Sequence, residues 1–320
     1  MKPTKRLAAI AATTAALAFG ANAQAFPTGK LTIIVPYSPG ATDQLARTLA
    51  GEVEKALGQP VVVETKPGAG GTIGANFVAK SSKPDGHTML VAVSSVQTVA
   101  PHQRKLPYGF ADLKPVARVT VGPNIMGARV GAPFKDLAGL VAYAKANPGK
   151  VSYGSAGTGG ATHLAGEAIA QAAGVKFNHV PFKGVTPAVA AAVGGNVDLV
   201  FGFASAIMPQ VAGGKLVAIA QLGDRRVSSL PDLTTLREGK VDLALVPNIG
   251  VWVPAGTPDD IVAKLEGAFR KAAASDAFKA FATKRMTEID FVGAADFAKV
   301  LAAEDKFFAK LLDSLGMAKK

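Results

Sequence analysis

Three glycine-rich turns constrain this chain most, because each follows an apolar run typical of a strand and opens a run typical of a helix. The start of a helix presents unpaired backbone N–H groups and the positive end of the helix dipole. Glycine lets a ligand approach that backbone closely, so each turn is a candidate anion site. The turns occupy residues 38–43, 67–72 and 155–162.

The strand-like and helix-like runs alternate along the chain, which predicts an α/β fold with parallel sheets covered by helices. Thr42 or Asp43 is expected to cap the helix after the first turn. Thr257, which Pro258 follows, is expected to cap the first of the helices near the end of the chain. Apolar runs predict strands at 31–35, 61–63, 88–93, 151–153, 175–180, 197–203 and 216–221. Amphipathic spacing predicts helices at 42–57, 71–80, 136–146, from the third turn to 174, at 186–193, between the last two strands, from 257 through 269, at 276–283 and at 294–315.

The order of these elements predicts two domains. The chain is expected to cross between them near 116–128 and 246–254, and two crossings make a hinge with a cleft. Domain 1 would then combine residues 26–124 with residues 250–320, and domain 2 would comprise residues 125–249. The terminal helices have no sheet of their own, so they are expected to pack back on domain 1.

Residues 1–25 have the pattern of a secretory signal peptide. Lys2, Lys5 and Arg6 precede an apolar run over 7–20, and small residues follow up to Ala25. That run is shorter than the ~20 residues of a membrane span. We therefore expect cleavage after Ala25 and a soluble, periplasmic protein. The chain has no cysteine, which excludes disulfides, thiol chemistry and a lipid anchor on an N-terminal cysteine.

The formal net charge is +12, but the Lys and Arg residues are scattered and never interleave with aromatic residues. This pattern argues against nucleic-acid binding. Attraction of an anionic solute and plain solubility account for the charge equally well.

Several catalytic and cofactor motifs are absent or incomplete. The third turn lacks the last glycine of a dinucleotide fingerprint, since Thr162 stands there, and no acid follows about 20 residues on. No P-loop exists, and the segment around Ser155 lacks the first glycine of a nucleophile elbow. The four histidines have no metal-ligand spacing, and no nucleophile–base pair is evident. We therefore expect no enzyme, no cofactor and no metal site.

Four residues remain open to two interpretations: His163, Trp252, Asp198 and Lys183. His163 either supports the third turn or touches a ligand, and His179 is expected at a satisfied core or strand-end position. Trp252 is either a core residue of a crossing strand or part of a cleft wall. Asp198 either fixes a loop by accepting backbone N–H bonds or contacts a ligand donor. Lys183 is either a surface lysine or a carboxylate partner.

A set of short motifs runs through the whole chain after the signal peptide, and together they resemble one family. The chain is similar to the Bug-type periplasmic solute receptors, the binding component of tripartite tricarboxylate transporters. The motifs that carry this resemblance are 34–43, 58–71, 84–88, 105–108, 153–157 with 163–165, 180–184, 194–198 and 253–258.

The resemblance implies two α/β domains of the periplasmic-binding-protein architecture, each a mainly parallel sheet flanked by helices, joined by two crossing strands with a ligand cleft between them. It implies capture of a small organic carboxylate by a monomer, without a cofactor or metal, and delivery to the membrane permease subunits of the transporter. Carried over by position, the binding residues are Tyr37, Ser38, Gly40, Thr42, Asp43, Gly70, Gly71, Thr72, Ser155, Gly157, Thr158, Gly159, Thr162, Phe182 and Asp198.

The sequence departs from the family pattern at two places. The first turn carries Gly40 alone where the family has two glycines, so Ala41 is expected to restrict a backbone angle that only glycine adopts easily. Gly202 and Phe203 follow Phe201 where the family often has Asp or Asn. This predicts an aromatic or aliphatic carboxylate as the ligand rather than an amino acid.

The function expected from these observations is a non-catalytic, exported solute receptor. Two other classes remain as alternatives: a ligand sensor that docks on a signalling partner, and an enzyme, either a hydrolase or an isomerase, that acts in the same cleft.

Overall fold

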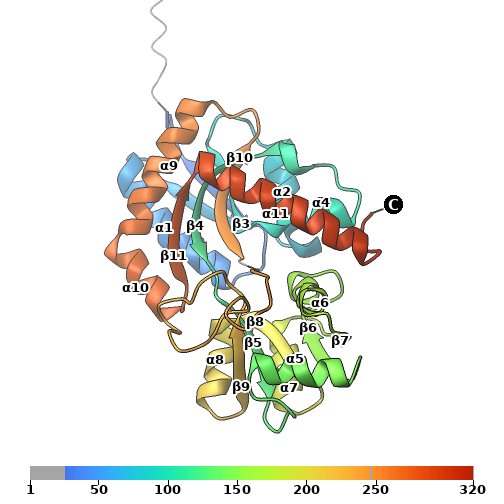
Figure 1. Ribbon diagram of the computed structural model, residues 1–320. Helices are drawn as coiled ribbons and strands as arrows, with labels where there is room; N and C mark the ends of the chain where they lie inside the picture. Colours follow the sequence, from blue (N-terminus) through green and yellow to red (C-terminus); the bar gives the residue numbers. More distant parts are fainter. Residues whose placement is uncertain (1–25, 246, 320) are drawn as a thin grey trace, which may run out of the picture.

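The protein folds into two α/β units, and a computed structural model describes residues 26–245 and 247–319. The expected signal peptide lies outside the described residues. Within these ranges, no helix combines the length and the apolar character needed to cross a bilayer. Figure 1 shows the two units one above the other, and both ends of the described chain lie in the upper unit.

The first unit is built on a six-stranded mixed sheet. In sheet order its strands are β11 (Glu288–Gly293), β4 (Leu113–Val121), β10 (Asn248–Pro254), β3 (Thr88–Val93), β1 (Leu31–Val35) and β2 (Val61–Thr65). β1 runs parallel to β2 and β3, with Ile33 opposite Val63 and Met89. β10 is antiparallel to β3 and β4, and β11 is antiparallel to β4. The carboxyl ends of β1, β2 and β3 therefore share one edge of the sheet, where the first two glycine turns begin.

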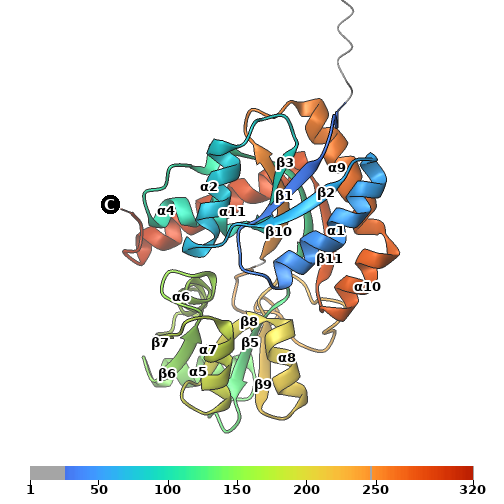
Figure 2. The ribbon, with the colours of Figure 1, turned by 180° about the vertical axis from the view of Figure 1, so that it is seen from behind.

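Helices cover both faces of this sheet because successive side chains of a buried strand point to opposite faces. Ile33 packs in one apolar cluster with Leu49, whereas Ile34 packs in another with Trp252. The helices on the face of Ile33 are α1 (Ala41–Leu57), α9 (Asp259–Ala274) and α10 (Asp276–Lys284). The helices on the other side are α2 (Thr72–Asn76), α3 (Ser95–Thr98), α4 (Ala100–Gln103) and α11 (Ala294–Ser314). Figures 1 and 2 show α2, α4 and α11 together on this side.

The second unit is built on a five-stranded mixed sheet. In sheet order its strands are β7 (Phe177–Pro181), β6 (Val151–Ser155), β8 (Leu199–Phe203), β5 (Asn124–Arg129) and β9 (Leu216–Gln221). Its helices are α5 (Leu137–Ala146), α6 (Ala161–Ala173), α7 (Val185–Val193) and α8 (Ala204–Ala212). β6 runs parallel to β7 and β8, whereas β5 is antiparallel to β8 and β9. The third glycine turn therefore leaves the carboxyl end of β6 and faces the first unit (Figure 2).

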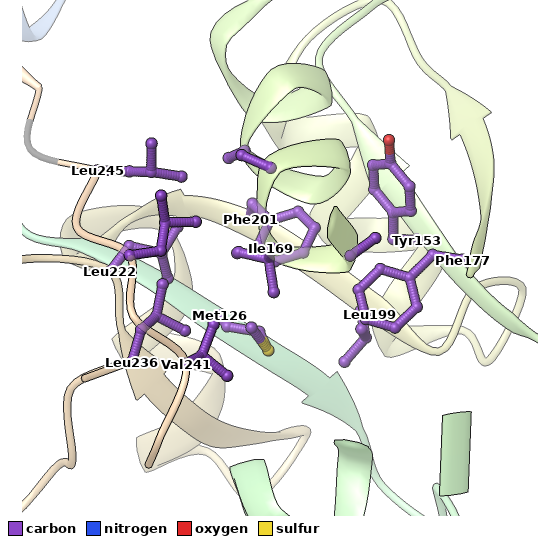
Figure 3. Close-up of a cluster of buried hydrophobic side chains, with 14 of the residues drawn as sticks. Met126, Tyr153, Ile169, Phe177, Leu199, Phe201, Leu222, Leu236, Val241 and Leu245 are labelled. Atoms are coloured by element: carbon purple, nitrogen blue, oxygen red, sulfur yellow. The ribbon is translucent and has the colours of Figure 1, made fainter. Parts of the chain in front are cut away.

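The main core of the second unit lies between its sheet and α5 and α6. Met126, Leu199 and Phe201 project from the strands toward Ile169 of α6 (Figure 3). The same cluster includes Leu222, Leu236, Val241 and Leu245 from the long connection after β9. Leu311 and Leu312 of α11 also belong to it, so the last helix of the chain reaches from the first unit to the second.

Two connections carry the chain between the sheets. β4 of the first sheet continues through Gly122 and Pro123 into β5 of the second, and the chain returns through the segment before β10. This arrangement agrees with the expected two-domain α/β architecture with two crossings. The exact residue boundaries of the two domains stay a prediction.

Three local expectations were wrong. β11 was not expected, because Glu288 and Asp290 interrupt its apolar pattern and the strand lies at a sheet edge. Gly40, not Thr42 or Asp43, precedes the first residue of α1, so neither side chain caps that helix. The Thr257 hydroxyl bonds to the Pro254 carbonyl instead of capping α9, which begins at Asp259.

Candidate functional site

The first glycine turn leaves β1 and enters α1 without strain. Gly40 has φ 176°, which is extended backbone open to any residue, and Ala41 is already helical. The expected restriction at Ala41 is therefore wrong, because the position requires no left-handed angle. Asp43 turns inward and pairs with Arg47 one helical turn later, at 3.0 Å between Oδ1 and the guanidinium. Ser38 is exposed.

Tyr37 joins the first turn to the second. Its hydroxyl accepts a hydrogen bond from the Val93 N–H at 3.3 Å, and burial raises its pKa to about 12. Gly71 has φ 96°, and a Cβ there would lie 2.9 Å from Cε1 of Tyr37. The ring therefore requires glycine at this position. The Thr72 hydroxyl donates to the Ala69 carbonyl at 3.0 Å, which fixes the turn from within.

The third turn is held by its own side chains. The Thr162 hydroxyl accepts from the Ala156 N–H at 2.8 Å, and the buried Ser155 hydroxyl accepts from the Gly157 N–H at 3.2 Å. Nδ1 of His163 accepts a hydrogen bond from the Gly159 N–H at 3.0 Å. Of the two interpretations of His163, the structure therefore shows the one in which it supports the turn. Thr158 at the tip is exposed.

His163 and His179 stack beneath this turn, with ring centroids 3.8 Å apart. Burial lowers the pKa of both imidazoles. The neighbouring imidazole of His163 lowers the pKa of His179 further, whereas the Glu167 carboxylate raises the pKa of both. Tyr153 completes the cluster by donating to Oε1 of Glu167 at 2.7 Å, and burial raises the pKa of its phenol. The cluster therefore favours two neutral imidazoles that hold the turn from below.

Ser155 and His179 form a pair that the sequence pattern did not indicate. The Ser155 Oγ lies 2.6 Å from Nε2 of His179, because β6 and β7 are parallel neighbours. The expected absence of a nucleophile–base pair was therefore wrong. The Ser155 side chain is nevertheless fully buried and lines none of the pockets described below, so in this structure it supports the turn.

The second and third turns meet at a pocket of about 320 Å³, here called the glycine-loop pocket. Of the predicted binding residues, it brings together Gly70 from the first unit and Gly157, Thr158 and Gly159 from the second. The Gln103 side chain bridges the two units by donating to the Gly159 carbonyl. The residues lining it are Gly70, Ser95, Val99, Ala100, Gln103, Arg104 and 156–161.

Arg104 gives this pocket a cation that was not predicted. A Cβ built at Gly70 would lie 3.4 Å from its guanidinium, so the charge stands directly beside the second glycine turn. A guanidinium is well matched to a carboxylate, which it can bind through two parallel hydrogen bonds. Nothing in the sequence marked Arg104 or Gln103, because both lie at the end of a short helix that carries no motif.

Other predicted residues lie elsewhere. Thr42 lines a smaller pocket of about 50 Å³ at the hinge, together with Phe203. Phe203 packs on Gly122, where a Cβ would lie 2.4 Å from its ring. Phe182 is half-buried and covers Gly154, and its N–H donates to the Ser155 carbonyl at 2.9 Å. Lys183 beside it is exposed, as expected of a surface lysine.

Asp198 lies at the opposite end of β8 from the glycine-loop pocket. One carboxylate oxygen accepts from the Ser152 N–H at 2.9 Å and from its hydroxyl at 2.8 Å, and the other accepts from Nε of Arg129 at 2.8 Å. Those hydrogen bonds and the Arg129 charge lower its pKa although burial, the largest influence, opposes them. The contacts show the loop-fixing role of Asp198. Its role as a binding residue stays a prediction.

Trp252 is a core residue. Its side chain is fully buried in β10, and Nε1 donates to Oε1 of Gln97 at 2.7 Å. The Gln97 amide donates in turn to the carbonyls of Phe110 and Leu113. The indole therefore anchors the first unit behind its sheet and forms no part of a cleft wall.

Comparison with known proteins gives one consistent result. A sequence model described as "Tripartite tricarboxylate transporter family receptor" matches residues 45–317. The Bordetella pertussis protein named BugT is 33% identical over 297 residues, which cover 90% of this chain and 91% of that protein.

Two solved structures share the fold over nearly their whole length. The Rhodopseudomonas palustris protein Rpa4515, solved with adipate, is 28% identical with a TM-score of 0.77, covering 92% of this chain and 99% of its own. MatC from the same organism, solved with bound malate, is 30% identical with a TM-score of 0.74, covering 90% of this chain and 100% of its own.

Proposed function

Because this chain belongs to the receptor family of tripartite tricarboxylate transporters, we propose that it is an extracytoplasmic receptor that captures a small organic carboxylate between its two α/β units. In this proposal it then delivers the carboxylate, chemically unchanged, to the membrane permease subunits. The domains that close on the ligand are residues 26–124 with 250–320, and residues 125–249.

The observation that carries this proposal is the composition of the glycine-loop pocket. Backbone from two glycine turns, one on each unit, lies at one pocket together with the Arg104 guanidinium. Backbone N–H groups at a helix start and a guanidinium both favour an anion. The relatives solved with adipate and malate hold carboxylates, so a carboxylate is the anion we propose.

We assign the carboxylate to the tip of the third turn at Thr158, with Arg104 as its charged partner from the first unit, because the N–H groups of Gly157 and Gly159 already donate to Ser155 and His163. Gly157 and Gly159 line the same pocket and let the ligand approach the backbone closely. Gln103, which already bridges to Gly159, would hold the two units in register around the ligand. The predicted residues of the first unit are proposed as walls of the cleft; they are Tyr37, Ser38, Gly40, Thr42, Asp43, Gly70, Gly71 and Thr72.

The test is isothermal titration of refolded, ligand-free protein with a panel of mono-, di- and tricarboxylates, together with the uncharged amide of each acid. At least one acid should bind and its amide should not. Arg104→Gln should weaken binding by about tenfold or more, since a hydrogen bond to a charged group contributes ~1.5–3 kcal/mol. The matched control is Lys105→Gln, which removes the same charge from the neighbouring exposed residue. The affinity of this variant for the acid should stay within about twofold of wild type, because an exposed charge contributes little.

Two further measurements separate this function from its alternatives. Recovery of the bound acid unchanged, followed by NMR over hours, separates a receptor from an enzyme. Uptake into vesicles that contain the permease subunits should require the receptor, which separates transport from sensing. Failure of every carboxylate to bind would refute the proposed function.

A further inference from the structure

A second pocket, of about 250 Å³, lies between the two units beneath the C-terminal helix; we call it the α11 pocket. α11 contributes Phe307 and Phe308, and α6 contributes Ala161 and Ala165. Phe307 is 38% exposed although it is a large apolar side chain, so its ring presents uncovered apolar surface to this space. The residues lining the pocket are Val93, Ser94, Ser95, Val99, Asn124, Ala161, Ala165, Ala244, Leu245, Pro247, Asn248, Ala303, Glu304, Phe307 and Phe308.

The α11 pocket adjoins the glycine-loop pocket. Ser95, Val99 and Ala161 line both, so the two spaces meet at the start of α3 and the start of α6. The two pockets differ in chemistry along this line. Glycine backbone and Arg104 lie on one side, and aromatic and aliphatic side chains lie on the other.

The polar end of the α11 pocket is acidic. The Glu304 carboxyl accepts hydrogen bonds from the Ser94 hydroxyl at 2.7 Å, the Thr98 hydroxyl at 3.0 Å and the Asn248 amide at 2.9 Å. Burial nevertheless raises its pKa, with a smaller contribution from Asp305. A second carboxylate placed here would meet this carboxyl without a cation from the pocket wall, since none of the lining residues is Lys, Arg or His. The pocket therefore disfavours the far carboxylate of a diacid.

We propose that the α11 pocket takes the apolar body of the ligand whose carboxylate lies in the glycine-loop pocket. This inference rests on the proposed function and narrows its substrate class to monocarboxylates that carry an alkyl chain or phenyl ring. A cavity of about 150 Å³ lined by apolar side chains holds a benzene molecule, so the volume here suffices for a body of about six carbons or more.

The selectivity expected from this arrangement follows from burial. Each methylene transferred from water to an apolar site contributes about fourfold to affinity. Affinity should therefore rise by about that factor per carbon from butanoate to hexanoate and octanoate, until the pocket is full. 3-Phenylpropanoate should bind in the same range as the longer chains, whereas malate and citrate should bind more weakly than any of them.

The test titrates these six acids, with adipate as a seventh, into the wild-type protein and two variants. Ala303→Leu narrows the α11 pocket from an exposed position on α11, where extra bulk is tolerated by the fold. Ala298→Leu makes the same change at an exposed position on the same helix that does not line the pocket. Circular dichroism and thermal unfolding of both variants check that each is folded.

The proposal expects octanoate affinity to fall about 16-fold or more in Ala303→Leu, the contribution of two displaced methylenes, and to stay within about twofold in Ala298→Leu. Butanoate affinity should change little in either variant. Tighter binding of malate, citrate or adipate than of octanoate would overturn the inference and leave the proposed function standing. Equal octanoate affinity in both variants would do the same. Absence of binding by all seven acids would count against the proposed function itself.

Discussion

Replacing Glu304 by glutamine tests whether the carboxyl at the end of the α11 pocket is neutral in the folded protein. An unfolded glutamate has a pKa near 4.5, and burial raises the pKa of Glu304 above that value in the fold. Between the two values the unfolded chain has released a proton that the folded chain retains. Stability must therefore fall as pH rises through this window, and below pH 4.5 the effect is absent.

The magnitude follows from the linkage relation and from the hydrogen bonds. One proton retained only by the folded state costs at most about 1.4 kcal/mol of stability per pH unit. The introduced glutamine can keep the bonds from Ser94 and Thr98 on its carbonyl oxygen, but its amide group would face the donating amide of Asn248. The loss of that bond costs about 1 kcal/mol at every pH.

The assay is urea denaturation of ligand-free wild type and Glu304→Gln at pH 4, 5.5 and 7, followed by far-UV circular dichroism. At pH 4 the variant should be about 1 kcal/mol less stable. The difference should shrink with rising pH, because only the wild type loses stability through this group. Asp313→Asn, at an exposed position on the same helix, serves as the matched control.

Two results would refute this reasoning. A stability difference that stays constant from pH 4 to pH 7 would mean that Glu304 titrates alike in the folded and unfolded chains. A variant that becomes relatively less stable as pH rises would mean that the three hydrogen bonds outweigh burial and stabilise the charged form.

Two other predictions follow from contacts of the second unit. Asp198→Ala removes the acceptor of Ser152 and Arg129, so it should lower the free energy of unfolding by about 1–3 kcal/mol in urea denaturation. Its carboxylate affinity by titration calorimetry should stay within about twofold of wild type, and a large loss of affinity would show that Asp198 is a binding residue. Burial lowers the pKa of His179, so wild-type stability should fall as pH drops below about 6.5, where the unfolded histidine takes up a proton first. His179→Gln should show less of that loss between pH 7 and pH 5.5, and an unchanged slope would contradict the prediction.

Much of the fold could be predicted because its signals are local. The spacing of Leu45, Leu49 and Val53 marks one buried face of α1, and the structure buries all three. The apolar runs of β1 and β3 likewise correspond to strands buried on both faces. β11 was missed because a half-buried edge strand has neither a continuous apolar run nor strict alternation.

The candidate site was harder to predict because its members meet only through the tertiary fold. The glycine turns were recognisable from their own sequence, but the meeting of Gly70 with Gly159 depends on how the two units are joined. Arg104 carries no local signal, since one exposed arginine resembles any other. The pairing of Ser155 with His179 depends on which strands become neighbours, a property of sheet order that no single segment encodes.

Asp198 shows the limit of assigning a role by position. The residue type fits a ligand contact, and its place beside an apolar strand fits a cleft. Its actual partners, Ser152 and Arg129, come from β6 and β5, and only the sheet order brings them to the start of β8. A carboxylate at the amino end of a parallel strand points away from the edge where ligands bind in α/β sheets.

The C-terminal helix adds a packed apolar contact between the two units to the crossing strands and to the hydrogen bond from Gln103 to Gly159. Leu311 and Leu312 share a buried cluster with the strands of the second sheet, and the Lys319 N–H donates to the His102 carbonyl of the first unit at 2.7 Å. Any change in the angle between the units must therefore shift the contacts that Leu311 and Leu312 make with the second unit. The end of α11 is therefore a sensitive reporter of movement between the two units. The environment of a fluorophore attached there would change when the units rotate relative to each other, whereas a label within either unit would keep its environment.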